Sequence, residues 1–238
     1  MIDSLKLGPG KGGIRMTPSV TEKEVERLAR AMTLKNALAN IPFGGAKSGI
    51  VFDPKTHTQK EKREIVEWFA KELKPVLVRS YIAGPDINMT EREMAWFVDA
   101  ANSHRAATGK PQSLGGLPHE LGSTGFGVAQ ATLLALKSKR IKPEEATVAI
   151  EGYGNVGVFA HKFLQEKGVQ IVAVSDSSGS IYSEDGLDYK KLLKIKKQTG
   201  SVTNYPSGKK LNNKEIFALP VTVLIPAALP DVINSSNI

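Results

Sequence analysis

Apolar residues recur every three or four positions over much of the chain, which is the period of an α-helix with one buried face. The stretches predicted to be helical are Val20–Asn40, Gln59–Leu73, Thr90–Arg105, Gly125–Lys139, Val156–Lys167 and Leu187–Lys197. Thr21 precedes Glu24 by three residues, and Thr90 precedes Glu93 by the same spacing, so a capping box is predicted where each of these two helices begins.

Short apolar runs rich in β-branched residues lie between these helices and predict strands. The runs are Gly49–Phe52, Val76–Ala83, Thr147–Ile150, Gln170–Val174 and Val221–Ile225. The Pro- and Gly-rich residues 41–45 before the first run predict a turn. Strand, helix and strand follow one another over residues 147–174, which predicts a βαβ unit. The second half of the chain is therefore expected to hold three strands.

A glycine- and proline-rich stretch after Gly109 marks a predicted domain boundary. The predicted fold class is α/β, with an N-terminal αβ substrate-binding and catalytic domain over residues 1–115. Residues 116–238 are expected to form a Rossmann-like dinucleotide-binding domain whose C-terminal part is missing. A chain of 238 residues is long enough for two such modest domains.

The composition narrows the classes of protein to which the chain can belong. Hydrophobic residues make up 41% of the sequence and charged residues 24%, as in a packed soluble protein. No run reaches the roughly 18 apolar residues of a membrane span, and the start lacks a signal-peptide pattern, so a cytoplasmic location is expected. With no cysteine and four histidines that lack metal-ligand spacing, disulfides are excluded and metal-free chemistry is expected.

The net charge of +8 raises nucleic-acid binding as a hypothesis, because clustered cations attract phosphates. The densest basic run, residues 190–197, has apolar residues between its lysines at helical spacing, which is more typical of a solvated helix face. A small anion is the alternative partner for the positive charge. We therefore expect a small-molecule substrate and neither nucleic-acid nor membrane binding.

A glycine motif follows the predicted strand that ends at Ile150. Gly152, Gly154 and Gly157 form G-x-G-x-x-G at the start of a predicted helix, which is the position that makes this motif specific. The first glycine permits a tight turn, the second lets the backbone approach a pyrophosphate, and the third lets helix and strand pack closely. The sequence therefore predicts a dinucleotide site.

An acidic residue about 20 positions after this motif is expected to bind ribose hydroxyl groups. Asp176 lies 19 residues after Gly157, at the end of the second predicted strand. Its negative charge disfavours a 2′-phosphate, so NAD is the predicted cofactor. Ser177 and Ser178 beside it leave NADP possible.

Three lysines in the first half have unusual surroundings. Lys11 and Lys47 are flanked by glycines, which remove bulk around a cation and let a ligand reach the backbone. Lys35 lies near the apolar stripe of its predicted helix. These settings predict a pocket for a small anion, in which clustered ammonium groups lower one another's pKa.

These segments, with residues 82–86 (IAGPD) and the glycine motif, resemble the glutamate/leucine/phenylalanine/valine dehydrogenase family over nearly the whole chain. The resemblance implies that Lys47 is the catalytic lysine, that Lys35 binds the substrate α-carboxylate and that Asp86 relays protons. It also implies further contacts, with Gly13 and Met32 on the substrate side and Thr124, Asn155 and Val156 on the cofactor side.

The implied activity is reversible oxidative deamination of L-glutamate to 2-oxoglutarate and ammonia with NAD or NADP, in a homo-oligomer. Lys11 matches the glutamate branch of the family, in which this lysine reaches the side-chain carboxylate. The alternatives are a dehydrogenase for hydrophobic amino acids and an inactive homologue that binds a dinucleotide or a full-length partner. Relative to the family, the chain is expected to be truncated at both ends.

Overall fold

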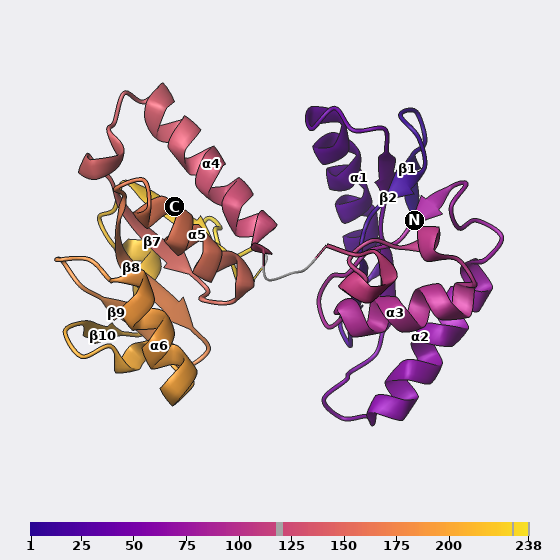
Figure 1. The fold of residues 1–238 in the computed structure, drawn as a ribbon. Helices are drawn as coiled ribbons and strands as arrows, with labels where there is room; N and C mark the ends of the chain where they lie inside the picture. Colours follow the sequence, from indigo (N-terminus) through magenta and orange to yellow (C-terminus); the bar gives the residue numbers. More distant parts are fainter. Residues whose placement is uncertain (118–120, 230, 238) are drawn as a thin grey trace. The chain divides into compact units, whose positions relative to one another are not determined.

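The computed structural model describes residues 1–117, 121–229 and 231–237, and its internal contacts divide the chain into two units, Met1–Leu121 and Gly122–Ile238 (Figure 1). Each unit has its own sheet, helices and hydrophobic core. The predicted α/β class is therefore confirmed. No helix among the described residues is long and apolar enough to cross a membrane.

The first unit contains a four-stranded sheet of order β1-β4-β2-β6, formed by β1 (Ile2–Ser4), β4 (Gly44–Ala46), β2 (Gly10–Lys11) and β6 (Tyr81–Ile82). Strand β2 runs parallel to β4 and β6, whereas β1 is antiparallel to β4. Beside this sheet, β3 (Ile14–Thr17) pairs in parallel with β5 (Ser48–Val51). The segments that carry Lys11 and Lys47 thus pass through neighbouring strands.

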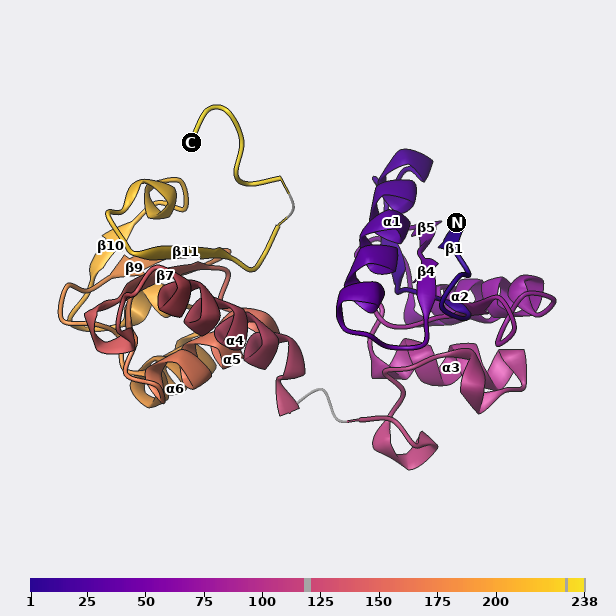
Figure 2. The same ribbon diagram turned by 90° about the horizontal axis from the view of Figure 1, so that it is seen from above.

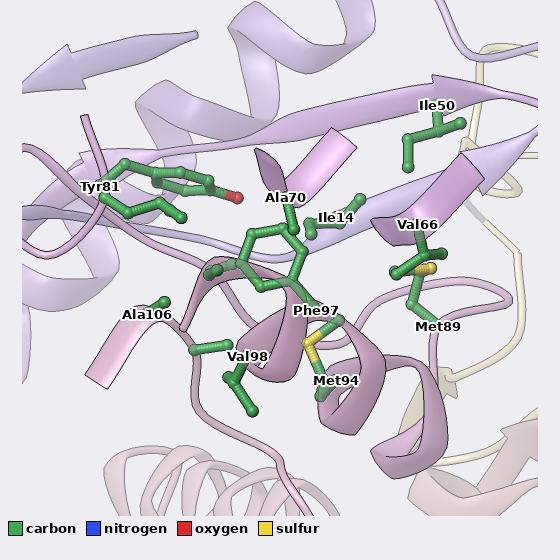
Figure 3. Packing of buried hydrophobic residues seen from close by; sticks show 14 of the residues in the cluster. Ile14, Ile50, Val66, Ala70, Tyr81, Met89, Met94, Phe97, Val98 and Ala106 are labelled. Carbon is green, nitrogen blue, oxygen red and sulfur yellow. The ribbon is translucent and has the colours of Figure 1, made fainter. Parts of the chain in front are cut away.

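Three helices surround these strands: α1 (Glu22–Leu38), α2 (Gln59–Leu73) and α3 (Glu91–Ala101). Their apolar faces follow the predicted periodicity. Figure 3 shows the buried core, where Phe97 and Met94 of α3 meet Val66 and Ala70 of α2 and residues from the strands. This core fixes the β3 and β6 segments from which the candidate site is built.

The helix starts agree with the sequence except at one cap. Thr90 and Glu93 form the predicted capping box. Thr21 accepts a hydrogen bond from the backbone N–H of Glu24, but the Glu24 carboxylate instead binds Arg15 at 2.6 Å. The predicted return hydrogen bond, from the backbone N–H of Thr21 to the Glu24 carboxylate, is therefore wrong, because the Arg15 guanidinium binds that carboxylate instead.

Three further predictions in the first unit are right over only part of their range. Helix α3 stops at Ala101, because Asn102 takes a left-handed conformation with φ of 53°, and a 3₁₀ turn follows. Only Tyr81–Ile82 of the predicted strand Val76–Ala83 is extended, since the chain turns tightly before it and Val78 has φ of 67°. The predicted turn is limited to residues 41–43, because Gly44 and Gly45 belong to the buried strand β4.

The second unit contains a five-stranded sheet of order β10-β9-β8-β7-β11. Its strands are β7 (Thr147–Glu151), β8 (Gln170–Asp176), β9 (Gly179–Tyr182), β10 (Lys209–Leu211) and β11 (Val223–Pro226). Strands β8 and β11 flank β7 in parallel, which confirms the predicted βαβ unit. Strands β9 and β10 are antiparallel additions, so the expectation of three strands is wrong.

Helices α4 (Ser123–Ser138), α5 (Asn155–Gln165) and α6 (Tyr189–Thr199) cover one face of this sheet (Figure 2). On the other face Ile216, from a 3₁₀ turn, packs on Ala149 and Ala173. A Cβ at Gly125 of α4 would overlap Phe159 and the backbone of α5, so the two helices pack with almost no gap. Strand β7 lies between its two parallel partners: the chain passes from β7 through α5 to β8 on one side, and β11, which follows β10 in the chain, pairs with β7 on the other.

The remaining short elements are 3₁₀ turns, at His104–Ala106, Gln112–Leu114, Pro143–Glu145, Val202–Asn204 and Glu215–Ala218.

Candidate active site

Lys47 and Asp86 form an ion pair in the first unit. Lys47 follows β4 and is only 7% exposed, whereas Asp86 lies between β6 and the turn at residues 87–88 and leaves 16% of its side chain exposed. The backbone N–H of Ile87 donates to Asp86 Oδ1 at 2.8 Å, which fixes the carboxylate beside the ammonium group. The two residues that the resemblance assigns to catalysis are therefore in direct contact.

Arg15 is a third charged member of this group. Its guanidinium lies 3.3 Å from Asp86 Oδ2 and 2.6 Å from Glu24 Oε1, so it connects β3 to the start of α1. Its Nε is buried and has no hydrogen-bond partner among the described residues. Arg15 and Lys47 thus both contact Asp86 Oδ2, in a cluster with unused donor capacity.

The pKa values of the pair follow from burial and from these neighbours. Burial lowers the pKa of Lys47, Asp86 opposes that effect, and the positive charges of Arg15 and Lys35 add to it. Burial alone would raise the pKa of Asp86, but the hydrogen bond and charge of Lys47 outweigh it and the pKa falls. The pair is ionic, with an ammonium that loses its proton more readily than an ordinary lysine.

Lys11 lies on β2 and donates a hydrogen bond to the carbonyl oxygen of Ala83 at 2.9 Å. Burial, with the charges of Lys47 and Lys110, lowers its pKa to about 8. A Cβ added at Gly84 would lie 2.9 Å from the Lys11 ammonium, so the glycine leaves room for this cation. Lys11 is therefore close enough to the pair to share its electrostatic field.

Lys110 is a buried cation that sequence reasoning missed. It is 8% exposed and donates to the carbonyl oxygen of Ala107 at 2.7 Å. The segment that carries it pairs through Ala107 with Ala83, whose carbonyl oxygen accepts the hydrogen bond from Lys11. The sequence signal was present, because Lys110 stands between a glycine and a proline as Lys11 stands between glycines.

The other predicted substrate-side residues lie on adjoining elements. Lys35 is exposed on α1, and Met32 is half-buried one turn earlier. The position of Lys35 near an apolar stripe does not bury it, but its charge still acts on Lys47. Gly13 follows β2, where a Cβ would come within 2.6 Å of the Pro85 carbonyl oxygen and 3.0 Å of Asp86 Cβ. Only glycine lets the chain pass so close to Asp86.

The glycine motif of the second unit has the geometry that a dinucleotide requires. Gly152 has φ of 95°, and a Cβ at Gly157 would overlap the carbonyl oxygen of Gly152. A Cβ at Gly154 would meet no described atom within 4 Å, so the backbone there is open to a ligand. Helix α5 begins at Asn155, and its N-terminus offers partial positive charge at this point. These residues fit a pyrophosphate.

A cavity of about 330 Å³ lies against this loop. It is bordered by residues 151–154 and 175–177, by Lys196 and Asn213, and by Ala228 and Leu229 after β11. This is the carboxyl edge of β7, whose neighbours in the sheet are β8 on one side and β11 on the other. Open α/β sheets bind ligands at such a switch point.

Asp176 borders this cavity, but its carboxylate is engaged by the protein. The backbone N–H groups of Ser178 and Val202 donate to it at 2.9 and 2.7 Å, and Ser201 Oγ donates at 3.2 Å. Lys196 Nζ lies 3.8 Å away, and only 7% of the Asp176 side chain is exposed. Asp176 lies where the sequence predicted it, at the end of the second strand of the βαβ unit. Its hydrogen-bond partners around Val202 could not be predicted from the sequence, because they are distant in the chain.

The remaining predicted cofactor residues lie at two helix starts. Thr124 is exposed in the first turn of α4, and Asn155 and Val156 are half-buried in the first turn of α5. The described residues contain no group of three or more His, Asp and Glu side chains that could hold a metal ion. The chemistry of the two regions therefore depends on amines, carboxylates and the glycine loop.

Comparison with known proteins gives two domain matches. Residues 2–103 match the domain described as "Glu/Leu/Phe/Val dehydrogenase, dimerisation domain". Residues 115–238 match "Glutamate/Leucine/Phenylalanine/Valine dehydrogenase". Together the two matches take in nearly the whole chain.

Individual relatives agree with these matches. The glutamate dehydrogenase of Aeropyrum pernix is 43% identical over 97% of this chain and 57% of its own length. The NADP-specific glutamate dehydrogenase of Saccharolobus shibatae is 43% identical over 97% and 56% respectively. A solved structure, the Leu-bound hetero-hexameric glutamate dehydrogenase of Thermus thermophilus, superposes with a TM-score of 0.84 at 33% identity, over 97% of this chain and 56% of that one. The chain thus spans little more than half the length of these relatives.

Proposed function

Because the chain belongs to the Glu/Leu/Phe/Val dehydrogenase family, we propose that it carries the catalytic residues of a glutamate dehydrogenase. Such an enzyme reversibly converts L-glutamate and water to 2-oxoglutarate and ammonia with NAD or NADP. The observation that carries the proposal is the buried ion pair of Lys47 and Asp86, with Arg15 on one side and Lys11 close by. That arrangement combines a readily deprotonated amine with cations for a dicarboxylate.

The cations bind and orient the substrate. Lys35 neutralises the α-carboxylate and Lys11 the side-chain carboxylate, because a dicarboxylate needs two separate positive anchors. Gly13 supports this geometry, since its lack of a side chain lets β2 lie against Pro85 and Asp86. A monocarboxylic amino acid would leave Lys11 without an anionic partner. The proposed substrate class is therefore a short dicarboxylic amino acid.

The pair of Lys47 and Asp86 moves protons. The nicotinamide, when bound, accepts a hydride from the substrate α-carbon and leaves an imine. Lys47, whose pKa is lowered by burial, takes a proton from the water that attacks the imine carbon. Asp86 then exchanges that proton with the Lys47 ammonium it contacts and with the departing ammonia. Arg15 keeps the carboxylate ionised between these transfers.

The second unit is proposed to bind the cofactor through Gly152, Gly154 and Gly157, with Thr124 and residues 155–156 at the two helix starts. The open space at Gly154 and the cavity beside it support this assignment. We further propose a homo-oligomer in the cytoplasm. The match of residues 2–103 to a dimerisation domain supports the oligomer, which light scattering of the purified chain would test.

The proposal is tested by reductive amination of 2-oxoglutarate with ammonia, measured in parallel with NADH and NADPH. Replacement of Lys47 by alanine should lower turnover by about 10² to 10⁴, the range for loss of a general acid–base group. Lys71→Ala is the matched control, because Lys71 is an exposed lysine near the end of α2. It should leave turnover unchanged.

The same assay separates an error in the catalytic assignment of Lys47 from the alternative that the chain is an inactive homologue. Equal turnover in folded Lys47→Ala and wild-type protein would overturn the catalytic assignment. No turnover in a folded, full-mass wild-type sample that still binds dinucleotide would favour the inactive homologue. Circular dichroism of every sample would separate loss of chemistry from loss of fold.

A further inference from the structure

Tyr81 of β6 brings a hydroxyl group into the core of the first unit. Only 3% of the residue is exposed, and its ring packs among the apolar side chains shown in Figure 3. The hydroxyl donates a hydrogen bond to the carbonyl oxygen of Gly12 at 3.0 Å. Gly12 directly follows Lys11, and the next residue, Gly13, packs against Asp86. Tyr81 therefore holds a backbone segment that borders two charged residues of the candidate site.

The same hydroxyl also meets the segment that carries Lys47. The side chain of Ser48, the residue after Lys47, interacts with this hydroxyl and opposes the rise in pKa that burial causes there. The backbone N–H of Ser48 donates to the carbonyl oxygen of Gly13 at 3.2 Å, so the two segments are also joined directly. The Tyr81 hydroxyl thus lies at the junction of residues 12–13 with residues 47–48.

The hydroxyl is a constant donor at this junction. Burial raises the pKa of Tyr81, and the negative charge of Asp86 adds to that rise, so the phenol stays protonated at neutral pH and does not act as a base. Phenylalanine would fill nearly the same volume without the cost of burying a polar group. What tyrosine adds at this position is the hydrogen bond between the two segments.

We propose that Tyr81 is a positioning residue for the ion pair of Lys47 and Asp86, because its hydroxyl fixes the backbone beside Asp86 relative to the backbone beside Lys47. The inference rests on the proposed dehydrogenase function and adds to it a residue that touches neither substrate nor cofactor. Such positioning matters for rate, since a displacement of about 1 Å in a catalytic group costs about a hundredfold.

A purely structural role for the hydroxyl predicts a different result. Loss of one buried hydrogen bond would then lower the stability of the first unit and leave the chemistry of the folded protein unchanged. A positioning role predicts a lower kcat in fully folded protein, together with a changed pKa of Lys47. The rate and this pKa therefore separate the two roles.

The experiment compares the wild type with Tyr81→Phe in the oxidation of glutamate from pH 6 to 10. The value of kcat should fall about ten- to a hundredfold. The KM for glutamate should change less than about threefold, because Lys11 keeps its hydrogen bond to the Ala83 carbonyl oxygen. The acidic limb of the pH–rate profile should move to lower pH, since a displaced Lys47 loses part of the Asp86 contact that raises its pKa.

A second measurement needs no turnover. Acetic anhydride modifies an amine only in its unprotonated form, so the pH dependence of Lys47 acetylation, followed by peptide mass spectrometry, gives the pKa of that side chain. This pKa should be lower in Tyr81→Phe than in the wild type, because the charges of Arg15 and Lys35, which also lower it, are unchanged. Ser48→Ala removes the other side chain at the hydroxyl and should shift the pKa of Lys47 in the same direction.

Tyr205→Phe is the matched control, because Tyr205 is also buried and its hydroxyl accepts a hydrogen bond from the backbone N–H of Asp188 in the second unit. It should leave kcat and the pKa of Lys47 unchanged. Circular dichroism confirms the fold of each variant. An unchanged pKa of Lys47 in folded Tyr81→Phe would overturn the inference alone. A folded wild type without turnover would contradict the proposed function, and the acetylation measurement would still decide whether Tyr81 holds the pair.

Discussion

The candidate sites of the two units treat charge in opposite ways. In the first, Lys47 and Lys110 are buried and Lys11 is half-buried, and Lys47 is the one of these three lysines that contacts a carboxylate, Asp86. In the second, the Asp176 carboxylate is surrounded by donors from its own chain. Positive charge without enough partners makes a site that is ready for an anion, whereas a saturated carboxylate has a structural role. The residue type alone does not distinguish them.

The largest expected effect tests the pair in the first unit. Replacement of Asp86 by asparagine should lower turnover by about 10² or more, because the proton relay is lost. The pKa of Lys47 should fall further, since the carboxylate is the partner that raises it. Because unprotonated Lys47 acts as the base, the acidic limb of the pH–rate profile, measured from pH 6 to 10, should therefore move to lower pH. An unchanged pH profile in folded Asp86→Asn would contradict the coupling.

The second prediction concerns a buried neutral group in the second unit. His161 is fully buried, its Nδ1 lies 2.8 Å from the Tyr153 hydroxyl and its Nε2 lies 2.9 Å from the Leu187 carbonyl oxygen. Burial lowers its pKa to about 4 from an ordinary 6.5. The unfolded chain then binds the proton first, so stability is complete above pH 6.5 and is lost as the pH falls toward 4.

This shift corresponds to roughly 3 kcal/mol of unfolding free energy over that pH range. Hydrogen exchange measured by mass spectrometry in peptides covering residues 147–165 would report it in the intact chain. His161→Gln, which cannot take up the proton, should flatten the pH dependence of this segment. The same slope in the variant as in the wild type would assign the effect to other groups.

The smallest expected effect tests substrate choice. Replacement of Lys11 by leucine should reduce kcat/KM for glutamate by about ten- to a hundredfold, the cost of losing one charge-assisted contact to a carboxylate. Leucine and valine, which have no side-chain carboxylate, should be used as well as before or better. Parallel assays of the three amino acids would measure this, and an unchanged preference would remove Lys11 from the substrate site.

Much of the scaffold could be predicted, because helices and the βαβ unit are encoded by local pattern. The periodicity of α1 and α2 and the alternation of strand and glycine loop around Gly152 need only neighbouring residues. Strand β4 was missed for the converse reason. It consists of the small residues Gly44, Gly45 and Ala46 and becomes a strand only through pairing with distant segments.

By itself the sequence predicted the α/β class, the glycine loop with Asp176 after it, and a pocket of Lys11, Lys35 and Lys47, because spacing and residue type encode these features locally. The roles of Lys35, Lys47 and Asp86 come from the resemblance to the family. Only the tertiary structure decided which charges meet. Asp86 joins Lys47 and Arg15 from three separate segments, whereas Asp176 faces the backbone around Val202 and the ammonium of Lys196. The strength of a charge depends on burial and on partners distant in the chain, and folding alone brings those partners together.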